Sequence, residues 1–169
     1  MRLTKIKLSN FRCFGANEQT ILIDDLTTFI GNNSAGKTAA LSALNCMFSE
    51  NSNDRLLHRS DFHLPKEKKP EEMEEQSLYV EAVFQFDELE SEGQDGEYAI
   101  PYYFQHMVVE NPGEVPYLRI RLSATWKKSS TLEGSIDSQI CYITCPESEE
   151  ILEDHCVRAQ RHDLDKIRV

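Results

Sequence analysis

Apolar and polar positions alternate at the start of the chain. In the segment Leu3–Leu8, Ile6 and Leu8 fall on one face and two lysines on the other, which is the period of two expected for a strand with one buried face. A second strand is predicted at Thr20–Ile23, and Thr27–Ile30 has the apolar character of a short buried strand. The pattern therefore predicts that the chain begins with strands.

The periodicity then changes. Thr38–Phe48 is rich in small residues and leucine, as expected for a helix that packs closely on a sheet. From Ser49 to Gln76 the pattern disappears, and the run Lys66–Glu75 carries mixed charge with almost no apolar residues. We expect residues 49–76 to form a solvated loop.

Several strand-like segments follow this loop without a helical pattern between them. Strands in unbroken succession favour an antiparallel meander over a parallel sheet. The predicted strands are Leu78–Phe86, Ile100–Val109, Tyr117–Trp126 and Ser135–Thr144.

The last part of the chain is acidic and compatible with a helix at Pro146–Leu164, and Asp165–Val169 has the pattern of a strand that is beginning. The chain thus divides into strands, loop and first helix (residues 1–48), a solvated loop (49–76), antiparallel strands (77–145), and a helix with the start of a strand (146–169).

Composition limits the classes of protein that this chain can belong to. It has 169 residues, of which 40% are hydrophobic, enough for one globular domain. No apolar run approaches the length of a membrane span, so we expect a soluble, cytoplasmic protein that does not contact membranes. Five cysteines without a dense framework predict free thiols. A net charge of -11 predicts repulsion of polyanions by the chain as a whole.

One loop carries recognisable chemistry. Eight consecutive residues match G-x-x-x-x-G-K-[ST] between a predicted strand and a predicted helix: Gly31, Asn32, Asn33, Ser34, Ala35, Gly36, Lys37 and Thr38. In such a loop the backbone N–H groups and the helix dipole surround phosphates. Lys37 would reach the β- and γ-phosphates of ATP, and the Thr38 hydroxyl would ligate Mg²⁺.

The alternative is an ordinary strand-to-helix turn with a solvated lysine. A lysine in the first turn of a helix opposes the helix dipole unless an anion is bound there. The motif and its context therefore favour phosphate binding over the ordinary turn.

The residues around this loop also carry a family resemblance. Ser9-Asn10-Phe11-Arg12-Cys13-Phe14, together with Phe29-Ile30-Gly31-Asn32-Asn33-Ser34-Ala35-Gly36-Lys37-Thr38, resembles the ATPase heads of the SMC and RecF-like branch of ABC ATPases. Within that branch the chain is most similar to the overcoming-lysogenization-defect (OLD) family of ATP-dependent endonucleases. These marks cover about the first quarter of the chain, and Arg59-Ser60-Asp61-Phe62 is merely compatible with them.

The resemblance implies an α/β fold, a P-loop ABC-type ATPase lobe with a mixed sheet and an antiparallel β-subdomain, of which residues 1–169 would be the N-terminal part. It implies that Arg12 lies near the nucleotide; the alternative is a solvent-exposed arginine. It further implies a homodimer through the ATPase heads, a C-terminal Toprim nuclease outside this chain that acts on DNA, and a role in phage defence. Two other readings remain, a RecF- or SMC-like repair ATPase without a nuclease, and a P-loop kinase or nucleotide switch.

The catalytic residues of such an ATPase cannot be located. ABC-type hydrolysis needs a buried strand ending in Asp and Glu, and a signature segment. The nearest candidate, Val83-Phe84-Gln85-Phe86-Asp87-Glu88, alternates with polar residues such as Glu81, so we interpret it as a strand with one wet face rather than the catalytic strand.

Three weaker clusters have simpler explanations. Cys141, Cys145, His155 and Cys156 lack the spacing of common zinc modules. The histidines around Asp61, His58 and His63, are interpreted as solvated loop residues. The acidic run Glu147, Glu149, Glu150, Glu153 and Asp154 is interpreted as one solvated helix face.

Overall fold

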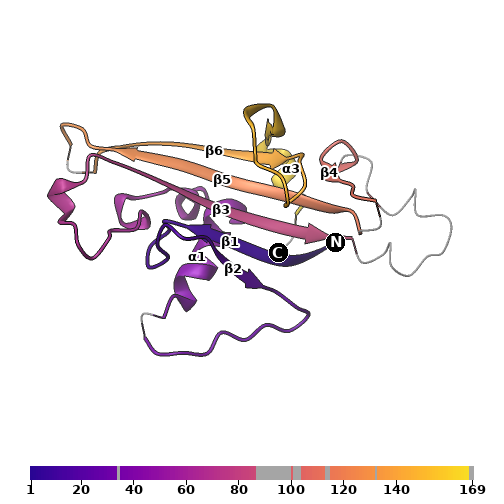
Figure 1. Cartoon of the computed structure of the whole chain (residues 1–169), viewed down its shortest axis with the longest axis horizontal. Coiled ribbons are helices and arrows are strands. Elements are labelled where there is room, and N and C mark those ends of the chain that lie inside the picture. The colour runs from indigo at the N-terminus through magenta and orange to yellow at the C-terminus, as the bar shows by residue number, and fades with distance from the viewer. Residues whose placement is uncertain (34, 87–99, 101–103, 113–114, 132, 168–169) are drawn as a thin grey trace.

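The centre of the molecule is one antiparallel sheet. The computed structural model describes every residue except 34, 87–99, 101–103, 113–114, 132 and 168–169. Within that part, the strands are in the order β2-β1-β3-β5-β6-β7, with β4 also paired to β5. Figure 1 shows the long strands side by side, with α1 (Lys37–Phe48) below them. The strands are β1 (Arg2–Ser9), β2 (Gln19–Leu22), β3 (Glu75–Gln85), β4 (Val108–Val109), β5 (Tyr117–Lys127), β6 (Ser135–Ile143) and β7 (Cys156–Arg158).

The main core lies between this sheet and α1. Leu8, Val80 and Leu122 are neighbours across β1, β3 and β5, and all three are buried. The helix turns its small side chains toward them, including Ala43, which is fully buried. Small residues at this interface let the helix approach the sheet closely, and this packing holds the start of α1 in place.

The predicted α/β class with an antiparallel sheet is confirmed. The helix was predicted at Thr38–Phe48 and is found at Lys37–Phe48, and the long strands after the loop begin and end within a few residues of their predicted bounds. All strand pairs among the described residues are antiparallel.

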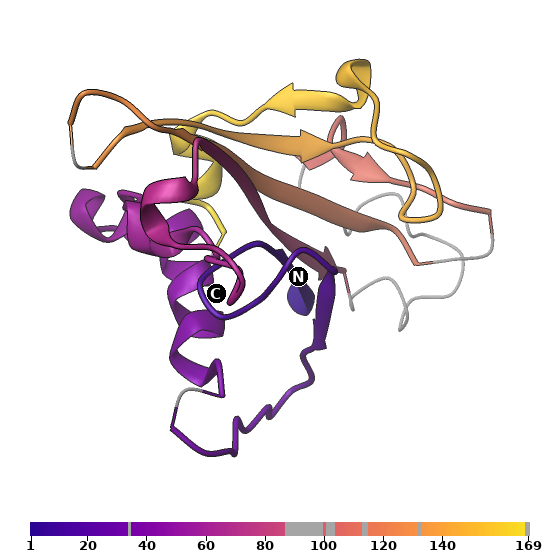
Figure 2. The ribbon, with the colours of Figure 1, turned by 60° about the vertical axis from the view of Figure 1, so that its left-hand side comes forward.

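The prediction of a short buried strand at Thr27–Ile30 is wrong. This segment has no strand assignment, and Ile30 is 90% exposed. Figure 2 shows why: after β2 the chain runs away from the sheet and returns at the N-terminal end of α1. A strand is stabilised by its neighbours, and no described strand lies beside this segment.

Two predictions in the second half are also wrong. Of Ile100–Val109, only Val108–Val109 is a strand; Phe104–Met107 forms a turn, and residues 101–103 lie outside the described part. Pro146–Leu164 is not one helix. It contains a single 3₁₀ turn (Glu153–His155), then β7, then the short helix α3 (Arg161–Leu164).

Polar composition predicted a helix at Pro146–Leu164, but four-residue α3 is too short to carry an amphipathic pattern. The beginning of a strand at Asp165–Val169 is not found either, because residues 165–167 form a turn and a coil and residues 168–169 lie outside the described part.

The sheet face opposite α1 is more buried than predicted. Glu81 is fully buried and accepts hydrogen bonds from Arg119 Nε at 2.9 Å and Arg121 Nε at 2.7 Å. Arg119 also donates to the backbone oxygen of Cys145, at 2.6 Å. The segment around Cys145 therefore lies over this face, which the alternation of polar residues in β3 could not reveal.

The segment that covers this face also carries part of the acidic run. Glu147 is bound by Lys5 Nζ at 2.8 Å and Lys7 Nζ at 2.6 Å. The predicted helix is therefore wrong for this run, and Glu147 is paired with two lysines of β1. The other four acidic residues of the run are exposed to solvent, as predicted: Glu149, Glu150, Glu153 and Asp154.

Candidate nucleotide-binding site

The glycine-containing loop leads directly into α1. Gly36 is the N-cap of the helix and has φ +91°, in the left-handed region that glycine tolerates best. A Cβ atom on Gly36 would lie 3.0 Å from Cζ of Phe14 and 3.1 Å from Sγ of Cys13. The loop between β1 and β2 therefore packs against Gly36, and a larger residue would push the two loops apart.

The first turn of α1 has no side-chain cap and no acidic residue. Its free N–H groups thus remain available to an anion. Lys37 Nζ donates to the backbone oxygens of Gly31 and Asn32, the latter at 2.8 Å. The lysine is folded over the loop, at the place where a phosphate would compete for it. Ser34 of the motif lies outside the described residues.

Arg12 lies beside this loop, in a constrained conformation. Its φ is +50°, which is rare for a residue with a side chain. Arg12 Nε donates to Asp61 Oδ1 at 2.8 Å, and Nη1 donates to Oγ of Ser42 in α1, also at 2.8 Å. The family resemblance implies that Arg12 lies near the nucleotide, and in the structure Arg12 lines the same cavity as the P-loop.

A single cavity of about 480 Å³ is lined by these elements. This size is within the range of small-molecule sites. Its lining consists of Arg12, Cys13, Asn33, Ala35, Gly36, Lys37, Thr38 and Ala39. Two cations and the uncapped helix start therefore meet in one space, an arrangement that attracts a polyphosphate.

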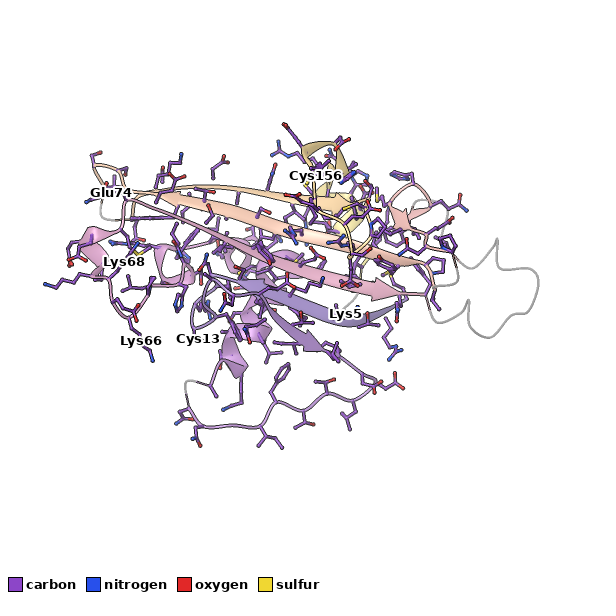
Figure 3. All side chains as sticks on the ribbon, in the orientation of Figure 1. Lys5, Cys13, Lys66, Lys68, Glu74 and Cys156 are labelled. Atoms are coloured by element: carbon purple, nitrogen blue, oxygen red, sulfur yellow. The ribbon has the colours of Figure 1, made fainter. Side chains whose placement is uncertain are left out.

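A larger cavity of about 950 Å³ adjoins the first, since both are lined by Arg12 and Cys13. It lies near the start of β3 and the end of β5, in the region where Figure 3 labels Cys13 and Lys66. Its wall includes Trp126, on whose ring the guanidinium of Arg59 is stacked at 4.9 Å from the centroid. This space is basic and partly aromatic.

Asp61 is the site residue that the sequence pattern did not identify. The loop histidines around it were interpreted as solvated, and no role was given to the carboxylate. In the structure Asp61 is 2% exposed, and His63 Nδ1 is 2.7 Å from the backbone oxygen of Arg12. The signal in the sequence that could have found Asp61 is the stretch Arg59–Phe62, which is compatible with the family pattern. Its contact with Arg12 spans 49 positions and is invisible to local periodicity.

The candidate catalytic strand remains unsupported. β3 is antiparallel to both its neighbours, and the carboxylates at positions 87 and 88 lie outside the described residues. Among the described residues no group of three or more His, Cys, Asp and Glu is arranged to hold a metal ion. The cysteines are free, as predicted, and burial raises the pKa of Cys46 to about 11.

Comparison with known proteins gives the family. The chain matches the AAA ATPase domain family over residues 1–167, and it belongs to that family. No curated protein matches it. A solved structure from work on "ATP-driven dimerization and DNA stimulated activation of SMC ATPases" is similar with a TM-score of 0.55 and 15% identity, over 99% of this chain and 77% of the other.

The fold is thus similar to that of an SMC ATPase, and membership of an ATPase family implies ATP binding. None of the helices in the described part of the chain has the length and apolar character that a bilayer crossing requires.

Proposed function

We propose that this chain is the ATP-binding lobe of an OLD-like, ATP-dependent DNA endonuclease. The observation that carries the proposal is the cavity in which Arg12, Lys37 and Thr38 meet at the uncapped start of α1. In the proposed complex Lys37 leaves the carbonyl oxygens of Gly31 and Asn32 and binds the β- and γ-phosphates, while Thr38 ligates Mg²⁺.

The adjoining cavity is large enough for the nucleoside. A nucleotide whose phosphates occupy the smaller cavity can extend past Arg12 and Cys13 toward the stacked pair of Arg59 and Trp126. The Trp126 ring is 2% exposed and is covered by Arg59, so a nucleobase would stack on the guanidinium plane of Arg59.

Pairing of two heads is part of the same proposal. The similar SMC structure is described as dimerising in an ATP-driven manner. In this chain most of the loop, including Asn32, Asn33 and Thr38, is exposed to solvent. A second copy that covers this exposed side would complete the site, and DNA would be bound and cut by domains outside this chain. A RecF- or SMC-like repair ATPase without a nuclease is the alternative, which a nuclease assay of the parent protein distinguishes.

The test is calorimetric titration with ATP and Mg²⁺. We expect Lys37→Ala to abolish measurable binding, because it removes the cation that reaches the phosphates while the core under α1 stays intact. Lys127→Ala is the matched control, since Lys127 is an exposed lysine that pairs with Glu75 away from the cavity. Equal ATP affinity of Lys37→Ala and the wild type would contradict the proposed function.

A further inference from the structure

Arg12 is held at its main chain as well as its side chain. Its N–H donates to the backbone oxygen of Asp61 at 2.8 Å, and its own carbonyl oxygen contacts His63 Nδ1 at 2.7 Å. Phe11 and Phe62 form an antiparallel bridge between the same two segments. A left-handed conformation at a non-glycine residue persists only where the surroundings over-determine it. Here the segment 61–63 supplies those contacts.

The side chain of Asp61 continues this restraint. It is 3% exposed, whereas the Arg12 side chain is 37% exposed. Asp61 Oδ1 accepts from Arg12 Nε and Oδ2 accepts from the backbone N–H of His58 at 2.8 Å. Both carboxylate oxygens are therefore used, and the carboxylate is fixed on the protein side of the guanidinium.

The contacts leave part of the guanidinium available. A guanidinium has five N–H donors. Among the described residues, Asp61 takes one donor and Ser42 takes another. The Phe11 ring lies 5.4 Å from the Arg12 Cζ atom and limits the rotation of the plane. The remaining donors belong to an arginine that lines the phosphate-loop cavity.

We propose that Asp61 is a positioning residue for nucleotide binding: it holds the Arg12 guanidinium so that its remaining donors face an anion in the P-loop cavity. This inference rests on the proposed function, because it assigns the residue that orients a ligand contact of the same site. Ordering the arginine before the ligand arrives removes an entropic cost from binding. The opposite role, in which Asp61 masks the charge of Arg12 and weakens binding, predicts an effect of opposite sign.

The experiment is a double-mutant cycle on the ATP dissociation constant. Asp61→Asn has one acceptor oxygen where two are needed and carries no charge, so we expect ATP binding to weaken about tenfold. Arg12→Ala should weaken binding at least as much. In the Arg12→Ala background, Asp61→Asn should change the affinity less than about twofold, because the residue acts through Arg12.

Three results of the affinity measurements would overturn the inference. Tighter binding by Asp61→Asn would indicate masking. An undiminished effect of Asp61→Asn in the Arg12→Ala background would indicate a general structural role, and unchanged affinity would show no role. Asp54→Asn is the matched control, because Asp54 lies in the same loop and bonds Ser49 instead of Arg12.

Folding of each variant is checked by thermal unfolding. Asp61→Ser is the second variant, since its hydroxyl can accept from the His58 N–H but is too short to reach Arg12 Nε. Loss of folding in both variants would make Asp61 a folding residue and overturn the assignment. Lys37→Ala is measured in parallel: if it loses ATP while Asp61→Asn does not, only the inference about Asp61 fails. If Lys37→Ala binds ATP normally, the proposed function fails.

Discussion

Gly36 is the residue on which the shape of the phosphate loop depends most directly. Its positive φ lets the chain turn from the loop into α1, and the absence of a side chain lets Phe14 and Cys13 approach. These two requirements are independent, since one concerns the backbone angle and the other the space around it. The same residue thus joins the nucleotide loop to the loop that carries Arg12.

We therefore expect Gly36→Ala to damage the site more than an ordinary glycine substitution. The left-handed conformation costs a residue with a Cβ about 1–2 kcal/mol, and the contacts with Phe14 and Cys13 add to that cost. ATP affinity measured by calorimetry should fall more than tenfold. Gly15→Ala is the control, because its Cβ would meet only His63, at an ordinary 3.7 Å. Equal ATP affinity of the two variants would contradict this account.

At the scale of elements, charged groups attach residues 145–147 to the sheet face opposite α1. Glu81 of β3 binds Arg119 and Arg121 of β5, and Arg119 in turn binds the backbone of Cys145. On β1, Lys5 holds Glu147 of the covering segment. Buried ion pairs of this kind are costly to break singly, because the partner left behind remains desolvated.

Glu81→Gln should lower the free energy of unfolding by about 3–5 kcal/mol, because it leaves Arg119 buried without its counter-charge. The measurement is urea unfolding monitored by circular dichroism. Glu75→Gln in the same strand is the control, since Glu75 is 55% exposed in its pair with Lys127 and should contribute less than about 1 kcal/mol. A loss below about 1 kcal/mol for Glu81→Gln would refute the role given to this ion pair.

Glu147 gives this attachment a pH dependence. Burial acts to raise its pKa, but hydrogen bonds and charge from Lys5 and Lys7 outweigh burial, so the pKa lies below the ordinary value of 4.5. A carboxylate with a lowered pKa stabilises the folded state at pH values above its unfolded pKa. That stabilisation is lost as the pH falls through the folded value.

Replacement of Glu147 by Gln should therefore flatten the loss of stability between about pH 5 and pH 3. Unfolding in urea at a series of pH values measures this slope. The difference between wild type and variant should be largest at neutral pH and shrink in acid. A constant difference over the whole range would show that Glu147 does not titrate with folding.

At the scale of the whole molecule, charge opposes direct binding of DNA. The chain carries 18 basic and 29 acidic residues. Several basic residues are already paired with carboxylates, among them Lys5, Lys7, Arg119 and Arg121. Each contact with a DNA phosphate requires a cation, and affinity built on such contacts falls steeply with salt.

We expect this chain alone to bind duplex DNA weakly or not at all at physiological salt. Fluorescence anisotropy with one labelled duplex at two salt concentrations measures this for the chain and for the longer parent protein that the proposed function assumes. Tight, salt-sensitive binding by the chain would reveal a basic surface that its net charge conceals. If the parent neither binds nor cuts DNA, the OLD-like proposal would give way to a plain nucleotide switch.

Sequence patterns correctly predicted the elements whose signal lies within one short segment of the chain. The phosphate loop, α1 and the long strands β3, β5 and β6 each have a motif or a period within one segment. The rest depends on contacts between distant segments. The sequence pattern places Glu81 on a solvated face, whereas in the structure Arg119 binds it and also binds the backbone of Cys145.

The candidate site divides in the same way. Lys37 and Thr38 follow from the spacing of the motif, whereas the pairing of Arg12 with Asp61 requires the loop after α1 to fold back on β1. The strand predicted at Thr27–Ile30 is wrong because its apolar residues suggested burial, whereas no described strand lies beside this segment to bury it.

The pairing of β1 with β3 has a consequence for the order in which the protein folds. Leu8 pairs with Val80, so the phosphate loop and α1 belong to the segment of about seventy residues between the two paired strands. Bringing β1 and β3 together costs the conformational entropy of closing that segment, and this cost slows the pairing. We therefore expect α1 to reach its final packing only after β3 has left the ribosome. Pulse-labelled hydrogen exchange should find the amides of β3 and β5 protected no later than those at the start of α1.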